Sequence, residues 1–368
     1  MRRYQLIFIL LIVLTSAPLA LAQSEDEDPA EPMRTFILKN PDQVGIACYA
    51  LDDGENGVYL NADVAFPLAS TAKILILTAY AQQVADGELD PQTRVHLETL
   101  NRYLLPGTDG GAHNAWLQTV VAEDETVLLD DVVYGMIRFS SNANTDYLLD
   151  QLDPERLENL IESLELTNTT IPGSILGLFL ALDNHETGVL DPDDITLEEL
   201  DALQATLAER YVTDADWRAA QGQRRLQAAV PLQQRYFSEN GSQGSPLDFA
   251  RLMEAIYTGA IGDEAAAIAR GYLAWPMIDF PLSWADFESV GTKGGSLPGI
   301  LTAAYYGHPV DGPPVVLAIF YRDLDLMTYF NWIQTFGFQL LELEAMNTAC
   351  ASLAPLVPAL ADTAETGT

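Results

Sequence analysis

The sequence predicts an α/β protein of the α+β kind, in which both ends of the chain form one antiparallel sheet flanked by helices. Short apolar runs bounded by Gly, Asn and Asp begin near residue 44 and recur after residue 289, and such runs are typical of strands. The residues between them, about 84–245, have mostly helical apolar spacing. This order indicates a sheet with an inserted all-helical subdomain.

The N-terminal residues 1–22 have the pattern of a signal peptide. Two arginines precede an apolar stretch at 6–14, and Ala-Leu-Ala at 20–22 supplies a small-residue cleavage site. A membrane anchor is the alternative, although the apolar stretch is short for a bilayer. We therefore expect an exported protein, periplasmic or extracellular. Residues 23–40, which begin acidic and proline-containing, are predicted to form a linker.

The main domain is predicted to span residues 41–350. Two apolar runs flank Asp53-Gly54 and Asn56-Gly57 near its start, which is typical of a hairpin. Residues 70–83 are apolar nearly all round a helix and are therefore predicted to be a buried helix. Two helical stretches within 126–151 flank a Ser-Asn break.

Later elements have equally local signals. Thr196 and Glu199 form a capping box at the start of a helix, and Pro246 suits the first turn of another. The remaining predictions are strands at 289–292, 301–306 and 315–321, turns at 294–299 and 307–314, a helix at 327–347 and a flexible tail at 351–368.

Composition excludes several functions. A net charge of −35 repels nucleic acid and anionic lipid, so we expect neither nucleic-acid binding nor membrane contact beyond the signal peptide. We also expect a monomer. The four histidines (His96, His113, His185 and His308) are scattered, and the two cysteines lack the spacing of a zinc site. We therefore expect no metal and no cofactor.

The two cysteines are Cys48 and Cys350. Export permits a disulfide, which would tie the first strand to the end of the last helix. The alternative is a pair of buried apolar thiols, and the sequence leaves both open.

Lysine is rare in this chain. Of the 18 basic residues only Lys39, Lys73 and Lys293 are lysines, which suggests that lysine is kept where a compact amine with an adjustable pKa is needed. Lys73 lies three residues after Ser70, so both side chains share one helical face near the positive helix N-terminus. A partly buried lysine can accept a serine proton near neutral pH. We predict a Ser70 nucleophile with Lys73 as its base.

Two further motifs follow S-T-A-K at 70–73, namely S-S-N at 140–142 and K-G-G at 293–295. Alone, each is typical of a helix cap or a strand-ending turn. Together, their order and spacing resemble those of the serine β-lactamase and penicillin-binding family, specifically its class A β-lactamase-like branch, which has S-x-x-K, S-D-N and K-T-G. The resemblance covers about 44–345, apart from 183–240, which looks like an insertion.

The resemblance implies a β-lactamase/transpeptidase-like fold and a serine hydrolase. Such an enzyme would hydrolyse a small-molecule substrate, a β-lactam amide, by acyl transfer through a seryl intermediate. The resemblance implies that Ser70 is acylated, with Lys73 as base or proton relay, and that Ser140 passes a proton to the leaving nitrogen. It also implies substrate-binding roles for four residues. Asn142 would hold Lys73 and the substrate amide, and Lys293 would bind the substrate carboxylate. Gly295 and Ser296 are the other two. The backbone N–H groups of Ser70 and Ser296 would form the oxyanion hole.

The chain departs from the family pattern at three places. Ser141 replaces the aspartate of S-D-N, and Gly294 replaces a hydroxyl residue whose hydrogen bond Ser296 would have to supply. The family's Glu-x-x-Leu-Asn signature, whose glutamate activates the deacylating water, is missing, because residues 171–182 contain no acidic side chain. Asp183 or Glu186 would replace it only if the insertion folded back over the site.

These departures leave alternatives to a β-lactam hydrolase. A D-alanyl-peptide peptidase or an esterase would share the acylating residues and deacylate slowly. A non-catalytic relative that binds cell-wall fragments or a protein is the other class. Tyr103 is predicted either to line the mouth of the site or to be a buried tyrosine beside a glycine turn.

Overall fold

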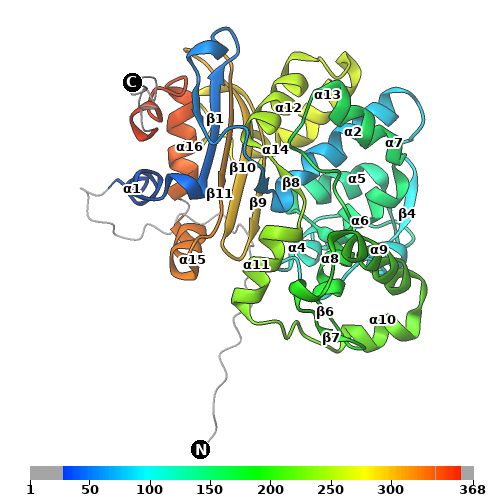
Figure 1. Ribbon diagram of the computed structural model, residues 1–368. Helices are drawn as coiled ribbons and strands as arrows, with labels where there is room; N and C mark the ends of the chain where they lie inside the picture. The colour runs from blue at the N-terminus through cyan, green and yellow to red at the C-terminus, as the bar shows by residue number, and fades with distance from the viewer. Residues whose placement is uncertain (1–27, 336, 358–368) are drawn as a thin grey trace, which may run out of the picture. The chain divides into compact units, whose positions relative to one another are not determined.

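The computed structural model of the protein describes residues 28–335 and 337–357 (Figure 1). The described chain divides into two compact units. We call residues 28–86, 153–172 and 229–357 the sheet unit, and residues 87–152 and 173–228 the helical unit. The predicted signal peptide lies outside the described residues, as do most of the predicted linker's acidic half and the end of the predicted tail.

Both ends of the chain build the sheet, as the sequence predicts. The five strands have the order β2-β1-β11-β10-β9 and pair antiparallel throughout. Their bounds are β1 (Val44–Ala50), β2 (Val58–Leu60), β9 (Phe287–Leu297), β10 (Ile300–Pro309) and β11 (Val315–Tyr321). The predicted hairpin at Asp53-Gly54 and Asn56-Gly57 is confirmed, because β1 pairs with β2 across it.

Strand β9 is longer than the sequence predicts. Residues 294–297 were expected in a turn, but they stay paired with β10, and Gly294 faces Ala303. The chain reverses only at Pro298 and Gly299, where Gly299 has a φ of +79° that favours glycine. In the sequence, Gly294 and Gly295 are typical of a turn. In the structure they extend the edge strand β9, where one face of Gly295 lies against the backbone of Leu68 and Ser70.

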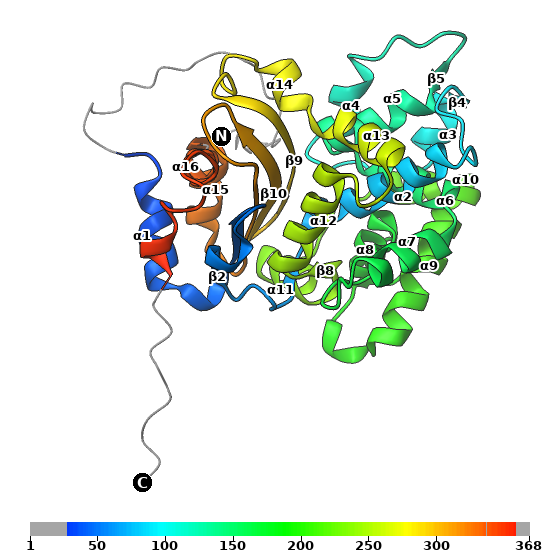
Figure 2. The ribbon, with the colours of Figure 1, turned by 90° about the horizontal axis from the view of Figure 1, so that it is seen from above.

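Helices cover both faces of this sheet. On one face, α1 (Glu31–Lys39), α15 (Leu326–Thr335) and α16 (Gly337–Asn347) enclose a core that includes Ile46, Leu317 and Trp332. On the other face lie α12 (Pro246–Thr258) and α13 (Asp263–Leu273), which packs on α2 (Lys73–Ala85) (Figure 2). The smaller elements of the sheet unit are α7 (Pro154–Ser163), α11 (Val230–Asn240), α14 (Trp275–Asp279) and the strand pair β3 (Phe66–Pro67) and β8 (Gln243–Gly244).

Two predicted irregular segments are partly ordered. The second half of the predicted linker forms helix α1, because Met33 and Ile37 stand four residues apart and both bury their side chains. The predicted tail begins with a short 3-10 turn at 354–356, where Leu353 and Leu356 are buried. In both segments a few apolar side chains reach the core, although the composition is that of a loose segment.

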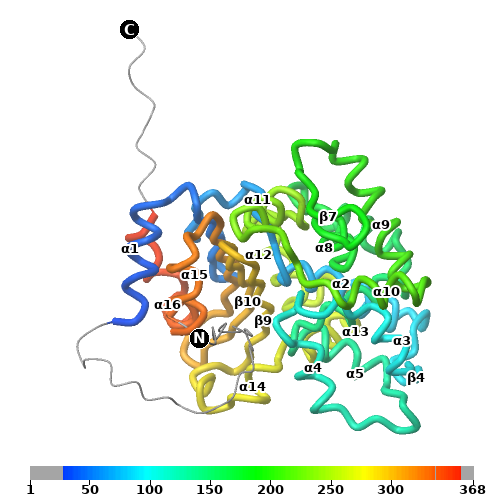
Figure 3. Tube along the Cα trace, turned by 90° about the horizontal axis from the view of Figure 1, so that it is seen from below, coloured from blue at the N-terminus to red at the C-terminus, as the bar shows by residue number. Residues whose placement is uncertain are grey.

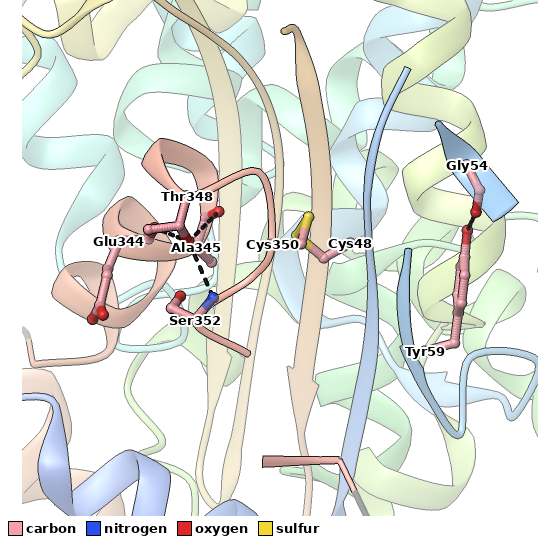
Figure 4. The surroundings of a disulfide bond; sticks show 8 residues. All are labelled: Cys48, Gly54, Tyr59, Glu344, Ala345, Thr348, Cys350 and Ser352. Carbon is pink, nitrogen blue, oxygen red and sulfur yellow. Dashed lines mark hydrogen bonds between the residues drawn. A yellow bond between two sulfur atoms is a disulfide. The ribbon is translucent and has the colours of Figure 1, made fainter. Parts of the chain in front are cut away.

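Cys48 and Cys350 form a disulfide, which decides the alternative that the sequence left open (Figure 4). Their Cα atoms are 5.7 Å apart and 302 residues separate them in the chain. The bond joins β1 to the residues after α16, inside the core on the α16 face of the sheet.

The helical unit contains most of the middle of the chain (Figure 3). Its helices are α3 (Leu97–Asn101), α4 (Ala112–Leu117), α5 (Leu129–Tyr134), the π-helical turn η4 (Gly135–Phe139), α6 (Asn142–Gln151), α8 (Ile175–Leu182), α9 (Leu197–Thr213) and α10 (Ala215–Gly222). Its strand pairs are β4 (Arg94–His96) with β5 (Thr126–Leu128), and β6 (Asp183–Asn184) with β7 (Gly188–Val189).

Helices α8 and α9 lie side by side in this unit. A Cβ at Gly177 would stand 2.4 Å from the carbonyl oxygen of Gln204, so only glycine lets the two helices approach this closely. The predicted capping box at Thr196 and Glu199 is confirmed at the start of α9. Helices α7 and α11 fall within the range predicted to be helical subdomain, but they belong to the sheet unit. Within the residues that the structure describes, no helix has the length and apolarity to cross a bilayer.

Candidate active site

Ser70 lies in a tight turn at the entrance to a buried helix. The turn η3 (Ala69–Ala72) is a 3-10 helix that continues into α2, where the sequence predicts an α-helix from Ser70 onward. Ala69 has a φ of +46°, which is uncommon for a residue with a Cβ. Ser70 is half-buried, whereas every residue from Thr71 to Ala81 is buried. The turn therefore presents the serine at the edge of the apolar helix.

Lys73 is the first residue of α2 and is only 1% exposed. Its neighbours Ile74 and Leu75 are fully buried. The backbone N–H of Lys73 donates to the carbonyl oxygens of Ser70 and Thr71. The structure thus places a buried amine one helical turn after the serine, which is the environment that the sequence predicts for this lysine.

Lys293 lies on β9, the edge strand of the sheet, and is 5% exposed. Burial lowers the pKa of its amine from 10.5 to about 7, because the charged form loses its hydration. Its Nζ donates a hydrogen bond of 2.5 Å to the carbonyl oxygen of Gly294. A lysine in this state changes its charge near neutral pH, as few lysines do.

Gly295 brings β9 against the Ser70 turn. A Cβ at this position would lie 2.7 Å from the backbone nitrogen of Ser70 and 2.5 Å from the carbonyl oxygen of Leu68. Real Cβ atoms do not approach other atoms so closely, so the contact requires glycine. The strand and the turn therefore meet backbone to backbone, and Gly295 lies next to the amide of the predicted nucleophile.

Ser296 points away from that contact. Its hydroxyl oxygen lies 2.7 Å from the hydroxyl of Tyr329 on α15, and side chains alternate between the two faces of a strand. Ser296 therefore shares a face with Gly294, and Lys293 shares the opposite face with Gly295. The Ser296 hydroxyl already has a partner on the α15 face, so it is not placed to replace the hydroxyl that Gly294 lacks.

Ser140, Ser141 and Asn142 lie in the helical unit, where Ser140 and Ser141 connect η4 to α6 and Asn142 is the first residue of α6. The predicted break between two helical stretches is confirmed, because Ser140 has a left-handed φ of +68°. The Ser141 hydroxyl caps α6 by accepting from the N–H of Asn144, and Asn142 Nδ2 donates to the carbonyl oxygen of Thr108 at 3.3 Å. The roles that the resemblance implies for Ser140 and Asn142 stay predictions.

His113 is a buried partner of this turn that the sequence does not reveal. Its Nδ1 lies 2.9 Å from the Ser141 hydroxyl and its Nε2 lies 3.3 Å from Asn101 Oδ1. Burial lowers the pKa of His113, although Asp109 opposes the shift, so the neutral ring is favoured. Ser141 stands where the family has an aspartate. This departure is the one feature of the sequence that indicates a different hydrogen-bond partner for residue 141.

Tyr103 packs inside the helical unit. Its hydroxyl donates to Asp150 at 2.7 Å, and its ring meets Tyr147 edge to face. Burial and the bond to Asp150 raise its pKa. The tyrosine is half-buried, and the glycines at 107, 110 and 111 all have positive φ, as the predicted glycine turn requires.

Most of the stretch 171–182, which lacks an acidic residue, forms the apolar helix α8. Asp183, at the end of that helix, is buried and accepts from Arg224 and from the N–H of Gln227. Glu186 is exposed and pairs with Arg210 at 2.7 and 2.9 Å, which holds the Glu186 pKa below its ordinary value. Both acids therefore already have local partners.

Comparison with known proteins gives the family and the fold of the chain. The model of the beta-lactamase enzyme family matches residues 28–331. The structure is similar to a beta-lactamase from Sphaerobacter thermophilus, with a TM-score of 0.55 and 18% identity over 90% of this chain and 100% of that one. It is also similar to a point mutant of PBP-A in an acyl-enzyme complex with penicillin G, with a TM-score of 0.52 and 17% identity over 86% of this chain and 96% of that one.

A variant of the last common ancestor of Gram-negative bacteria beta-lactamase class A shares 16% identity with a TM-score of 0.51, over 86% of this chain and 99% of that one. Identities this low establish a common fold and nothing finer. No curated protein sequence matches the chain. The family model nevertheless spans well over half of the 368 residues. The chain therefore belongs to the beta-lactamase enzyme family and has a class A β-lactamase-like fold.

Proposed function

We propose that this protein is an exported serine enzyme that β-lactams acylate at Ser70. The observation that carries the proposal is the backbone contact between Gly295 and Ser70. It brings the serine amide, the buried Lys73 and the edge strand with Lys293 into one unit. A nucleophile, an amine and backbone donors next to one another are the parts that acyl transfer requires.

In the proposed reaction, Lys73 accepts the proton of the Ser70 hydroxyl, whose oxygen attacks the lactam carbonyl carbon. The negative charge that forms on the carbonyl oxygen is stabilised by the N–H groups of Ser70 and Ser296. The C–N bond of the lactam then breaks, an ester with Ser70 remains, and the leaving nitrogen takes up a proton. The resemblance assigns that proton to Ser140, the substrate amide to Asn142 and the substrate carboxylate to Lys293.

We infer that the acyl-enzyme is hydrolysed slowly. Residues 171–182 lack a carboxylate, and Asp183 and Glu186 have local partners in Arg224 and Arg210. A water molecule would therefore lack the glutamate that activates it in the family's β-lactamases. This favours a penicillin-binding mode of action, in which the natural substrate is a D-alanyl peptide or an ester, over rapid hydrolysis of β-lactams.

Intact-protein mass spectrometry after exposure to penicillin tests this proposal. The parent protein is expected to gain the full mass of one penicillin and to lose it over many minutes. Ser70→Ala is expected to gain nothing, while Ser283→Ala, which changes an exposed serine, is expected to react like the parent. An equal adduct on Ser70→Ala rejects the assignment of the nucleophile.

Other outcomes identify the alternatives. An adduct lost within seconds, with turnover of nitrocefin, identifies a β-lactamase, whereas turnover of a D-Ala-D-Ala peptide or a short-chain ester identifies a peptidase or an esterase. If none of these probes reacts with the parent, the protein is a non-catalytic relative.

Export is the remaining part of the proposal. The signal-peptide pattern at 1–22 supports it, and so does the Cys48–Cys350 disulfide, since disulfides persist mainly in oxidising compartments. Sequencing the N-terminus of protein from cultured cells is expected to find Gln23. A mature chain that retains residues 1–22 would contradict cleavage.

A further inference from the structure

Two buried threonine hydroxyls connect the Ser70 turn to the sheet. Thr71 Oγ1 and Thr302 Oγ1 lie 2.8 Å apart, although 231 residues separate the two threonines in the chain. Thr71 is fully buried and Thr302 is 5% exposed. Thr302 Oγ1 also lies 2.7 Å from the carbonyl oxygen of Leu68. We call these two side chains the threonine pair.

The direction of each hydrogen bond follows from counting protons. A carbonyl oxygen only accepts, so Thr302 must donate its single hydroxyl proton to Leu68. In the bond between the two threonines Thr302 is therefore the acceptor, and Thr71 is the donor. The alternative acceptor for Thr71, the carbonyl oxygen of Lys293, is 3.4 Å away, so the shorter bond to Thr302 takes the proton.

These bonds close a ring at the start of the turn. The backbone N–H of Thr71 donates to the carbonyl oxygen of Leu68 at 3.1 Å, and the same oxygen accepts from Thr302. Leu68 directly precedes Ala69, whose φ of +46° a residue with a Cβ rarely adopts. Such a backbone persists only where its surroundings hold it in place, and the threonine pair supplies bonds that do so.

The ring also fixes the turn against β9. Thr302 is the register partner of Gly295 on the adjacent strand. A Cβ at Gly295 would lie 2.5 Å from Thr302 Oγ1 and 2.7 Å from the nitrogen of Ser70. The hydroxyl, the glycine and the serine amide are thus packed against one another, so a shift of the turn moves the Ser70 amide relative to the strand.

We propose that Thr302 is a positioning residue for Ser70, and that its hydroxyl holds the turn so that the serine oxygen and the Ser70 N–H keep their productive geometry. The inference rests on the proposed acylation of Ser70. Thr302 does not touch substrate in this proposal. It acts through Leu68 and Thr71, and its loss slows the acylation step more than it weakens binding.

The test compares Thr302→Val, which keeps the shape and removes the hydroxyl, with Thr302→Ser, which keeps the hydroxyl. Stopped-flow acylation by a penicillin gives the dissociation constant and the limiting rate separately. Thr302→Val is expected to lower the limiting rate about 10- to 100-fold with little change in the dissociation constant, since small misplacements of a reacting group cost this much. Thr302→Ser is expected to stay within about threefold of the parent.

Thr78→Val is the matched control. Thr78 is a fully buried threonine on α2 whose hydroxyl donates to the carbonyl oxygen of Ile74 at 2.8 Å. Its loss removes a comparable hydrogen bond away from the turn, so the acylation rate is expected to be unchanged. A parental rate in Thr302→Val, an equal loss in Thr302→Ser or an equal loss in Thr78→Val overturns the proposal.

Amide hydrogen exchange of residues 68–73 in the free protein separates this inference from the proposed function. Thr302→Val is expected to exchange these amides at least about 10-fold faster than the parent, and Thr302→Ser at the parental rate. If penicillin does not acylate the parent, the proposed function fails, and this exchange still decides whether Thr302 holds the turn. Unchanged exchange in Thr302→Val refutes the role of the threonine pair.

Discussion

Gly295 and Ser70 are in backbone contact, since a Cβ on the glycine would stand 2.7 Å from the serine nitrogen. The neighbouring Gly294 is different, because a Cβ there would meet its nearest atom, the carbonyl oxygen of Thr302, at 3.5 Å, which is an ordinary contact. The two adjacent glycines of β9 therefore differ in the space available for a side chain. Gly295 has no room for a side chain, whereas Gly294 has room.

Gly295→Ala is accordingly expected to displace the Ser70 turn from β9 and to lower the rate of acylation by about 100-fold or more. Gly294→Ala is expected to change that rate by less than about threefold. The rate of penicillin adduct formation, followed by mass spectrometry, compares the two variants. Equal rates for both would show that the close approach at Gly295 does not matter for the reaction.

Lys293 predicts a fall of acylation at alkaline pH. Its amine is charged below its pKa of about 7 and neutral above it, and only the charged form attracts a substrate carboxylate. The second-order rate constant for a penicillin is therefore expected to fall as pH rises from 7 to 9, because that constant reports groups of the free enzyme. An ester without a carboxylate is expected to lack this fall.

Lys293→Arg provides the control, because arginine stays charged throughout this range. Its rate constant is expected to be lower than the parent's but without the decline between pH 7 and 9. If the parent shows no decline with penicillin, Lys293 does not bind the carboxylate through its charge.

The disulfide predicts a loss of stability without a loss of chemistry. Cys48 and Cys350 close a loop of 302 residues, so replacing both by alanine is expected to lower the free energy of unfolding by about 2–5 kcal/mol. The bond lies in the core on the α16 face, away from the turn that carries Ser70. Urea unfolding and the acylation rate together test this, and slower acylation in the folded variant would contradict it.

Sequence patterns predicted the parts of the fold that local chemistry decides. The hairpin after Val44, the capping box at Thr196 and the sheet made from both chain ends all follow from signals within a few residues of each element. The predicted end of β9 was wrong, because a glycine pair is typical of a turn in any sequence. Only the contact with Ser70 explains why Gly295 belongs to a strand.

The candidate site shows the same limit. Ser70, Lys73 and Lys293 were predicted because their types and spacing are unusual within the chain. Thr302 and His113 were not predicted, because the importance of each depends on a hydrogen-bond partner that is distant in the sequence. Thr302 contacts Thr71, which is 231 residues away in the chain, and His113 contacts Ser141, which is 28 residues away. No local sequence pattern predicts either contact.

Glu342 predicts how stability depends on pH. This carboxyl on α16 is buried and shares a 2.6 Å hydrogen bond with the Tyr305 hydroxyl, and burial raises its pKa from 4.5 to about 8. Between these values the folded protein holds a proton that the unfolded chain releases. The free energy of unfolding therefore falls as pH rises from 4.5 to 8, with an upper limit of about 5 kcal/mol from this group.

Glu342→Gln cannot ionise, so it is expected to be more stable than the parent at pH 7 and closer to it at pH 5. Urea unfolding at pH 5 and pH 7 measures the difference in free energy of unfolding between variant and parent. The titration of Lys293 cancels in this difference, because both proteins contain Lys293. Glu344→Gln, which changes a carboxylate that is 43% exposed and paired with Arg34, is the control and is expected to lack the gain. If the stability of Glu342→Gln relative to the parent is the same at pH 5 and pH 7, the Glu342 carboxyl of the folded protein does not titrate in this range.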